Sequence, residues 1–221
     1  MTLRLGLVRR RECVLPTLRG WIVFFLVSIL LIAGAVLGVY PFLSVNDPRP
    51  GGILVAEGWG TQETMRDVLD EFRRNHYEGL FVTGGPIEEM SPLAEYKTYA
   101  ELGALLLTRL GGDPKTIHAI PAPKVVQDRT YASAVALKRW MYEHGLAGSP
   151  VNIMTSGAHS RRTRLLFQKA FGDRVTVGML ATPDEDFDPR RWWTSSAGFR
   201  CVTGEAIAYL YARFLFRPSG E

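Results

Sequence analysis

His159 and Arg162 are the residues whose types and spacing suggest chemistry most directly. They stand in Thr155-Ser-Gly-Ala-His-Ser-Arg-Arg162, where the strand-like apolar run 151–154 ends and a helical pattern begins. An imidazole titrates near neutral pH and can give or take a proton. A guanidinium can hold a phosphate or carboxylate through two hydrogen bonds, and a helix N-terminus also favours anions. The stretch therefore predicts a site for a phosphorylated or otherwise anionic ligand.

Three carboxylates are candidates to act with His159 in catalysis. Glu57 follows a predicted strand and Glu95 stands near the start of a predicted helix, where surface exposure is the alternative reading. Glu205 is the only acid in the otherwise apolar helical segment 202–216. A buried carboxylate needs a partner, so we expect Glu205 to support His159 or Arg162 unless its helix position is exposed.

A small or polar turn follows four of the five predicted strands. The carboxyl ends of parallel strands share one edge, so these turns can converge on one ligand, and glycines let backbone approach it. Ordinary turn structure is the alternative for each residue alone, and Asp128 or Thr130 could instead cap a helix. The expected ligand-binding residues are Gly58, Gly84, Gly85, Asp128, Thr130, Ser156, Gly157 and Arg162.

Other polar residues of these stretches are given lesser roles. Ser156 lacks the glycine that a nucleophile elbow has two positions earlier, because Met154 stands there, so covalent catalysis is not favoured. Arg161 and Arg164 are expected on a solvated helix face. No metal site is expected, since the remaining histidines have no metal-ligand spacing; they are His76, His118 and His144.

Strands alternate with helices through the part of the chain that must position these residues. Strands are predicted at 52–56, 80–82, 116–120, 151–154 and 174–179. Thr61 can cap a helix whose apolar residues recur with helical spacing, and a second helix is predicted from Ser91-Pro92 to Leu110. This order predicts an α/β fold, a three-layer Rossmann-like domain with a mostly parallel sheet, at residues 52–217.

An apolar segment, 21–43, predicts one N-terminal transmembrane helix before that domain. No charged residue lies between Arg19 and Asp47, and about 20 apolar residues suffice to cross a hydrocarbon core of about 30 Å. A cleaved signal peptide is the alternative, because Ala33-Gly34-Ala35 resembles a cleavage site, but the apolar run is longer than a typical signal. The proline- and glycine-containing residues 44–51 are predicted to be a linker.

The basic excess of the chain lies entirely before this segment. From Ser44 onward, basic and acidic residues number 21 each, although the whole chain has a net charge of +4. No nucleic-acid partner is therefore expected. By the positive-inside rule, residues 1–20 are a cytoplasmic basic tail, and the domain of this single-pass plasma (inner) membrane protein is extracytoplasmic. Cys13 and Cys201 would then lie on opposite sides of the membrane and cannot pair.

The motifs together resemble the DUF218 family, also called YdcF-like, which includes the SanA-like and ElyC-like envelope proteins. The resemblance extends over about residues 52–215 and departs at Glu57-Gly-Trp-Gly60 and at Arg129-Thr130, where many members have a glycine-rich turn and an Asn-Thr pair. It is carried by Val82-Thr-Gly-Gly85, Asp128-Arg-Thr-Tyr-Ala-Ser-Ala134, Thr155-Ser-Gly-Ala-His-Ser-Arg-Arg162 and Trp193-Thr-Ser-Ser-Ala-Gly198 followed by Glu205.

The resemblance implies a Rossmann-type fold, frequent membrane anchoring and a role in cell-envelope, peptidoglycan or lipid-carrier metabolism, without a settled reaction or cofactor. We therefore predict that the domain binds a phosphorylated or anionic envelope small molecule or lipid-linked precursor, with catalysis left open. One alternative is a non-catalytic envelope binding or scaffold protein, with Trp59, Trp192 and Trp193 lining a partner surface. Another is an S-adenosylmethionine- or nucleotide-binding enzyme, which would suit a cytosolic domain.

Overall fold

The computed structural model describes residues 15–87 and 96–218. The chain divides into two compact units, Met1–Leu37 and Gly38–Glu221. The first contains most of helix α1, Leu18–Leu43, which is long and apolar enough to cross a membrane. This helix begins three residues before the predicted segment. Glu95 and the predicted helix start at Ser91-Pro92 lie outside the described residues.

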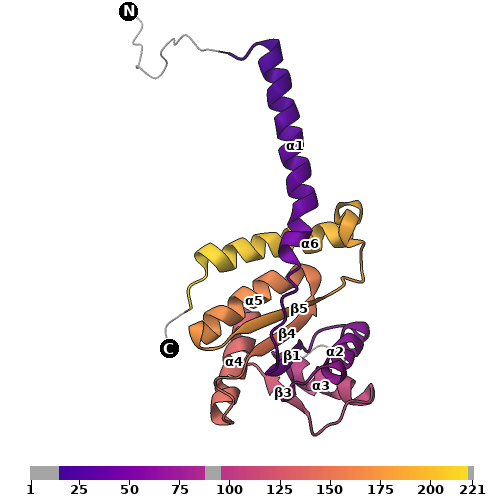
Figure 1. The fold of residues 1–221 in the computed structure, drawn as a ribbon, viewed down its shortest axis with the longest axis vertical. Coiled ribbons are helices and arrows are strands. Elements are labelled where there is room, and N and C mark those ends of the chain that lie inside the picture. Colours follow the sequence, from indigo (N-terminus) through magenta and orange to yellow (C-terminus); the bar gives the residue numbers. More distant parts are fainter. Residues whose placement is uncertain (1–14, 88–95, 219–221) are drawn as a thin grey trace, which may run out of the picture. The chain divides into compact units, whose positions relative to one another are not determined.

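The second unit is built on a five-stranded sheet (Figure 1). All neighbouring strands are parallel and their order is β3-β2-β1-β4-β5, which confirms the predicted parallel sheet. Most strand ends differ from the prediction by one or two residues, but β5 begins three residues late because Gly172–Arg174 form a 3-10 turn. The strands are β1 Ile53–Glu57, β2 Leu80–Gly84, β3 Ile117–Pro121, β4 Val151–Ser156 and β5 Val177–Thr182.

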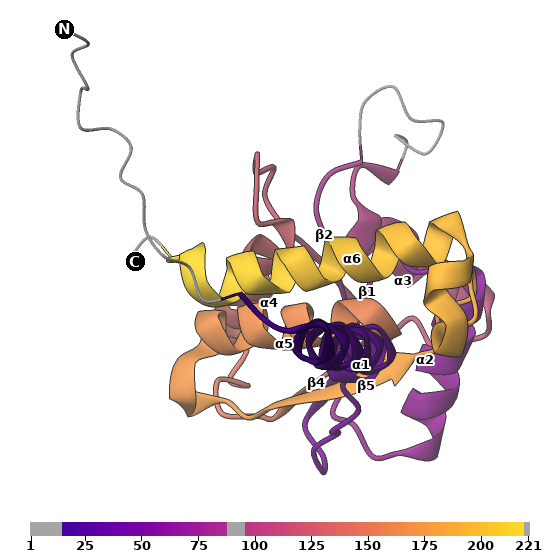
Figure 2. The same cartoon turned by 90° about the horizontal axis from the view of Figure 1, so that it is seen from above.

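Helices cover both faces of the sheet (Figure 2). Alternate residues of β1 enter two separate cores: Ile53 and Val55 pack with α4 and α5, whereas Leu54 and Ala56 pack with α2 and α3. The three-layer prediction is thereby confirmed. The α-helices are α2 Gln62–Arg74, α3 Tyr99–Arg109, α4 Arg129–Glu143, α5 Gly157–Phe171 and α6 Ser196–Leu210; the 3-10 turn η3 is Pro189–Thr194 and the π-helix η4 is Tyr211–Leu215.

Side-chain caps begin three of the α-helices, with Ser195 accepting from Gly198 N at the start of α6. Thr61 accepts a hydrogen bond from Thr64 N at the start of α2, as the sequence predicted. Helix α3 begins with a capping box, in which Thr98 and Glu101 exchange side-chain and backbone hydrogen bonds. This box brings the first turn of α3 to the carboxyl ends of β1 and β2.

The direction of chain progression reverses between β1 and β4. From β1 the chain adds β2 and β3 on one side, and it then crosses to add β4 and β5 on the other. Ligands of open α/β sheets bind in the crevice at such a switch point, outside the carboxyl ends of the strands. The reversal therefore points to the ends of β1 and β4.

Residues 44–51, predicted to be a linker, are bonded to the domain. Asp47 pairs in antiparallel fashion with Met179 of β5, and Arg49 N donates to Asn152 Oδ1 at 2.7 Å. Arg164, expected on a solvated helix face, instead makes an ion pair with Asp47 at 2.6 Å. The segment predicted to be a linker therefore supplies partners to buried Asn152 and to partly buried Arg164.

Candidate functional site

Three buried polar side chains form a row across the carboxyl ends of the central strands. They are Thr83 of β2, Glu57 of β1 and Thr155 of β4, each at most 5% exposed. Glu57 is in register with Thr83, and Thr155 Oγ1 donates to Glu57 Oε2 at 2.5 Å. Two positions earlier, each strand carries a core residue of the α4 and α5 side, so the period of two directs all three polar side chains to that side.

His159 reaches this row from the first turn of α5. Its Nε2 lies 3.5 Å from Glu57 Oε2, and its Nδ1 lies 2.9 Å from Glu205 Oε1. Helix α5 begins directly after β4, so the imidazole is presented at the switch point. The imidazole thus lies between two carboxylates that come from the first strand and the last α-helix of the domain.

Arg162 lies one helical turn after His159 and holds the same Glu205. Its Nε donates to Glu205 Oε2 at 2.8 Å and its Nη2 donates to Glu205 Oε1 at 3.0 Å, a bidentate pair. Glu205 is partly buried and contacts both of the residues that the sequence suggested as its partners. Residues at i and i+3 share a helix face, which explains why one carboxylate meets both.

The four groups set one another's charge. Burial is the largest influence on the pKa of His159 and would lower it, but Glu57 and Glu205 together outweigh burial and raise the pKa to about 9. Burial would raise the pKa of Glu205, yet hydrogen bonds from His159 and Arg162 lower it to about 2. Burial likewise opposes ionisation of Glu57, but the charge of nearby His159 holds its pKa below the usual range.

His159 is accordingly an imidazolium at neutral pH, and the two cations balance the two carboxylates. Arg162 Nη2 also lies 2.9 Å from His159 Nδ1. In the imidazolium both atoms are donors, so this contact is no hydrogen bond, and Glu205 Oε1 accepts from both instead. Before a ligand binds, His159 is therefore a proton donor and not a base.

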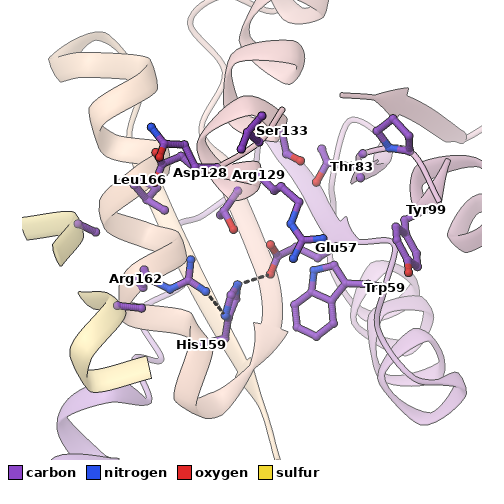
Figure 3. Close-up of a pocket in the computed structure, with 18 of the residues that line it drawn as sticks. Glu57, Trp59, Thr83, Tyr99, Asp128, Arg129, Ser133, His159, Arg162 and Leu166 are labelled. Carbon is purple, nitrogen blue, oxygen red and sulfur yellow. Dashed lines mark hydrogen bonds and ion pairs between the residues drawn. The ribbon is translucent and has the colours of Figure 1, made fainter. Parts of the chain in front are cut away.

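A cavity of about 580 Å³ opens over this cluster (Figure 3). Two buried atoms of its wall, His159 Nε2 and Thr83 Oγ1, have no hydrogen-bond partner in the described protein. A buried polar atom left without a partner costs about 1–3 kcal/mol, so both atoms favour a ligand that accepts hydrogen bonds. The wall also includes Glu57, Trp59, Gly84, Gly85, Tyr99, Val126, Asp128, Arg129, Thr130, Ser133, Arg162, Leu166, Ala208, Tyr211 and Ala212.

The amino end of α4 also lines this cavity. Asp128 occupies its N-cap position in the left-handed region, with φ 58°, and its side chain makes no capping bond to the described residues. The side chain of Arg129 points toward Glu57 and Trp59 (Figure 3). Thr130 also lines the cavity. Asp128 therefore does not play the capping role, and α4 presents its positive end and a guanidinium to the cavity.

The amino end of α5 is already occupied by the protein's own carboxylate. Asp184 Oδ2 accepts hydrogen bonds from Ala158 N at 3.1 Å and from the Tyr40 hydroxyl at 2.8 Å. A Cβ on Gly157 would lie 2.3 Å from that hydroxyl, so this glycine serves close packing. The expectation that this helix start receives a ligand anion is wrong. The helix amino end that faces the cavity is that of α4.

The other predicted turn residues divide between packing and the cavity. A Cβ on Gly58 would lie 2.1 Å from the Tyr99 carbonyl oxygen, and one on Gly84 would lie 2.7 Å from Tyr99 Cβ, so both glycines admit the first turn of α3. Gly85 lines the cavity with no such neighbour. Ser156 lines a second cavity, of about 210 Å³. Glu57 and Trp59 line this cavity too, together with Asp184 and Cys201.

Thr83, Thr155 and Arg129 were absent from the predicted site. The alternation of the strands could have found both threonines, since each stands two positions after an inward-facing apolar residue. Among the described residues, no cluster of His, Cys, Asp and Glu has the arrangement of a metal site. Comparison of the chain with protein-family models, curated proteins and solved structures found no match in any of the three.

Proposed function

We propose that the 580 Å³ cavity binds a phosphorylated or otherwise anionic small molecule, with His159 as the main donor to its charged group. One observation carries this proposal. The buried imidazole of His159, whose pKa is raised, lines the cavity, and its Nε2 has no hydrogen-bond partner in the described chain. Glu57 Oε2 lies 3.5 Å from this Nε2, too far for a strong hydrogen bond. The Nε2 proton can therefore be donated to an acceptor oxygen of the ligand instead.

Further donors surround the same space. Thr83 Oγ1 lies on the strand edge, Arg129 reaches in from α4, and the amino end of α4 adds its partial positive charge. Arg162 is held by Glu205 and therefore contributes charge and positioning more than a free guanidinium fork. Together these groups suit a phosphate with several oxygens better than a single carboxylate.

Acid–base catalysis is the second candidate function, supported by the opposite protonation states of His159 and Glu57. In a hydrolytic step, Glu57 would take a proton from an attacking water while His159 gives one to the leaving oxygen; proton transfer from Glu57 to His159 would then restore both. The lowered pKa of Glu57 makes it a weak base. Ligand binding is therefore the better supported function.

The membrane and envelope part of the proposal rests on α1 and on the DUF218-like motifs. In this proposal α1 anchors the chain in the plasma membrane with its basic tail in the cytoplasm, and the ligand is an envelope precursor, soluble or lipid-linked. The arginines before the apolar segment support this orientation. Reporter fusions at the C-terminus should be active only outside the cytoplasm; a cytoplasmic signal would favour the nucleotide or S-adenosylmethionine alternative.

Calorimetry on the full-length protein in detergent tests the binding function. The probes are inorganic phosphate, sugar phosphates, nucleotides and a polyprenyl phosphate. Replacing His159 with Gln should weaken binding of the best probe by about tenfold or more, the usual loss for a hydrogen bond to a charged group. Tyr142→Ala, at an exposed position of α4, is the control and should bind normally. Equal affinity for His159→Gln would remove the proposal.

A further inference from the structure

Helix α6 and the π-helix η4 expose a row of large apolar side chains. Phe199, Ile207, Leu210, Phe214 and Leu215 are each more than half exposed. The first four recur with helical spacing and so lie along one side, which we call the α6 face. Large exposed apolar patches on a folded domain usually mark a surface that binds a protein, a membrane or a ligand.

The exposed charged residues of α6 and of the segment after it, up to Pro218, are all positive. Arg200, Arg213 and Arg217 are exposed, and Glu205, the only acid between Ser196 and Pro218, is turned into the cluster with His159. A helix with one apolar side and basic residues beside it is typical of helices that lie in the interface of an anionic bilayer. A protein partner would more often meet a mixture of both charge signs.

The last turn of α1 ends against the same helix. The Phe42 ring lies 5.4 Å from the Tyr209 ring in an edge contact, and the Arg161 guanidinium lies 4.0 Å from the centre of the Phe42 ring. These residues all belong to the unit Gly38–Glu221. Aromatic residues at the end of a spanning helix lie at headgroup level, and α6 contacts the aromatic residue at that end of α1.

We propose that the α6 face docks on the surface of the membrane in which α1 is anchored, with anionic phospholipid as its partner. This inference rests on the anchoring part of the proposed function. The opposite side of the same helix lines the cavity with Ala208, Tyr211 and Ala212. Docking would therefore hold the cavity one helix diameter, roughly 10 Å, from the lipid surface.

Site-directed fluorescence on the full chain tests this docking. The protein, with Cys13→Ser and Cys201→Ala, receives one cysteine carrying an environment-sensitive dye and is placed in nanodiscs that contain phosphatidylglycerol. Lipids with a quencher near the headgroup should reduce emission at Phe199→Cys and Leu210→Cys by about half or more. Leu30→Cys lies near the middle of α1 and reports on anchoring through lipids with a quencher deep in the acyl chain. Tyr142→Cys at an exposed position of α4 should stay unquenched with either lipid.

The outcomes separate the docking from the anchoring on which it depends. Quenching at position 30 without quenching at 199 and 210 would overturn the docking and leave the anchor intact. Absence of quenching at position 30 would remove the anchor and with it the docking. A blue-shifted but unquenched signal at 210 that rises with protein concentration would show a second copy of the chain on this face and would also overturn the inference.

Discussion

His159 Nδ1 lies 2.9 Å from Glu205 Oε1, although 46 positions separate the two residues. The contact joins the first turn of α5 to the middle of α6. It helps to keep the imidazole at the cavity protonated and positively charged. The apolar helix that holds Glu205 therefore contributes to the site through this one carboxylate. Its inner side positions His159 and Arg162, while its outer side is free for another surface.

Removing the charge of Glu205 should lower the pKa of His159. In Glu205→Gln the hydrogen-bonding carboxylate is lost, so the pKa should fall from about 9 toward the ordinary value of 6.5. An NMR titration of the imidazole measures this directly. Glu143→Gln, at the exposed end of α4, is the control and should leave the titration unchanged. An unaltered His159 titration in Glu205→Gln would show that the pair is not what holds the charge.

The pH dependence of stability follows from the same groups. The raised pKa of His159 stabilises the fold fully below about 6.5, and this contribution is lost as pH rises through about 9. The lowered pKa of Glu205 acts above about 4.5 and is lost as pH falls through about 2. Tm of the wild type should therefore fall between pH 6.5 and 9, and His159→Gln should lack this fall. Parallel curves would contradict the assignment.

The two threonines beside Glu57 offer a matched pair of substitutions. Thr155→Val removes the donor that lies 2.5 Å from Glu57 Oε2 and should lower the free energy of unfolding by about 1–3 kcal/mol, because a buried charge loses its partner. Thr83→Val removes a hydroxyl with no partner in the described chain and should be neutral or slightly stabilising. Chemical denaturation of both variants decides this; equal losses would mean that the Thr155 bond contributes nothing.

Alanine substitutions at the glycine turns should separate packing from ligand contact. Gly58→Ala places a Cβ 2.1 Å from the Tyr99 carbonyl oxygen, so it should lower Tm through an overpacking cost of about 1–3 kcal/mol. Gly85→Ala meets only the Pro123 carbonyl oxygen at 4.0 Å, so Tm should hardly change while ligand affinity falls. The reverse ranking of the two Tm values would show that α3 does not pack as described.

The fold could be predicted because its signals are local and repeated. Strand and helix periods identified the sheet, and the isolation of Glu205 in an apolar helix identified its pairing. What failed depended on contacts between distant segments. The sequence gives no sign that Asp184 occupies the start of α5 or that Asp47 pairs with Arg164, because both contacts join residues brought together only by the folded domain.

The central claim is that the protonated Nε2 of His159 donates to an anion in the cavity, and ¹⁵N NMR of this atom tests it most directly. Full-length protein labelled at histidine is titrated with phosphate and sugar phosphates at neutral pH. The account predicts a saturable shift of the His159 Nε2 resonance, with the imidazolium state retained and no change at His76 or His144. An unshifted Nε2 at saturating concentrations of every anion, or a neutral imidazole before titration, would contradict it.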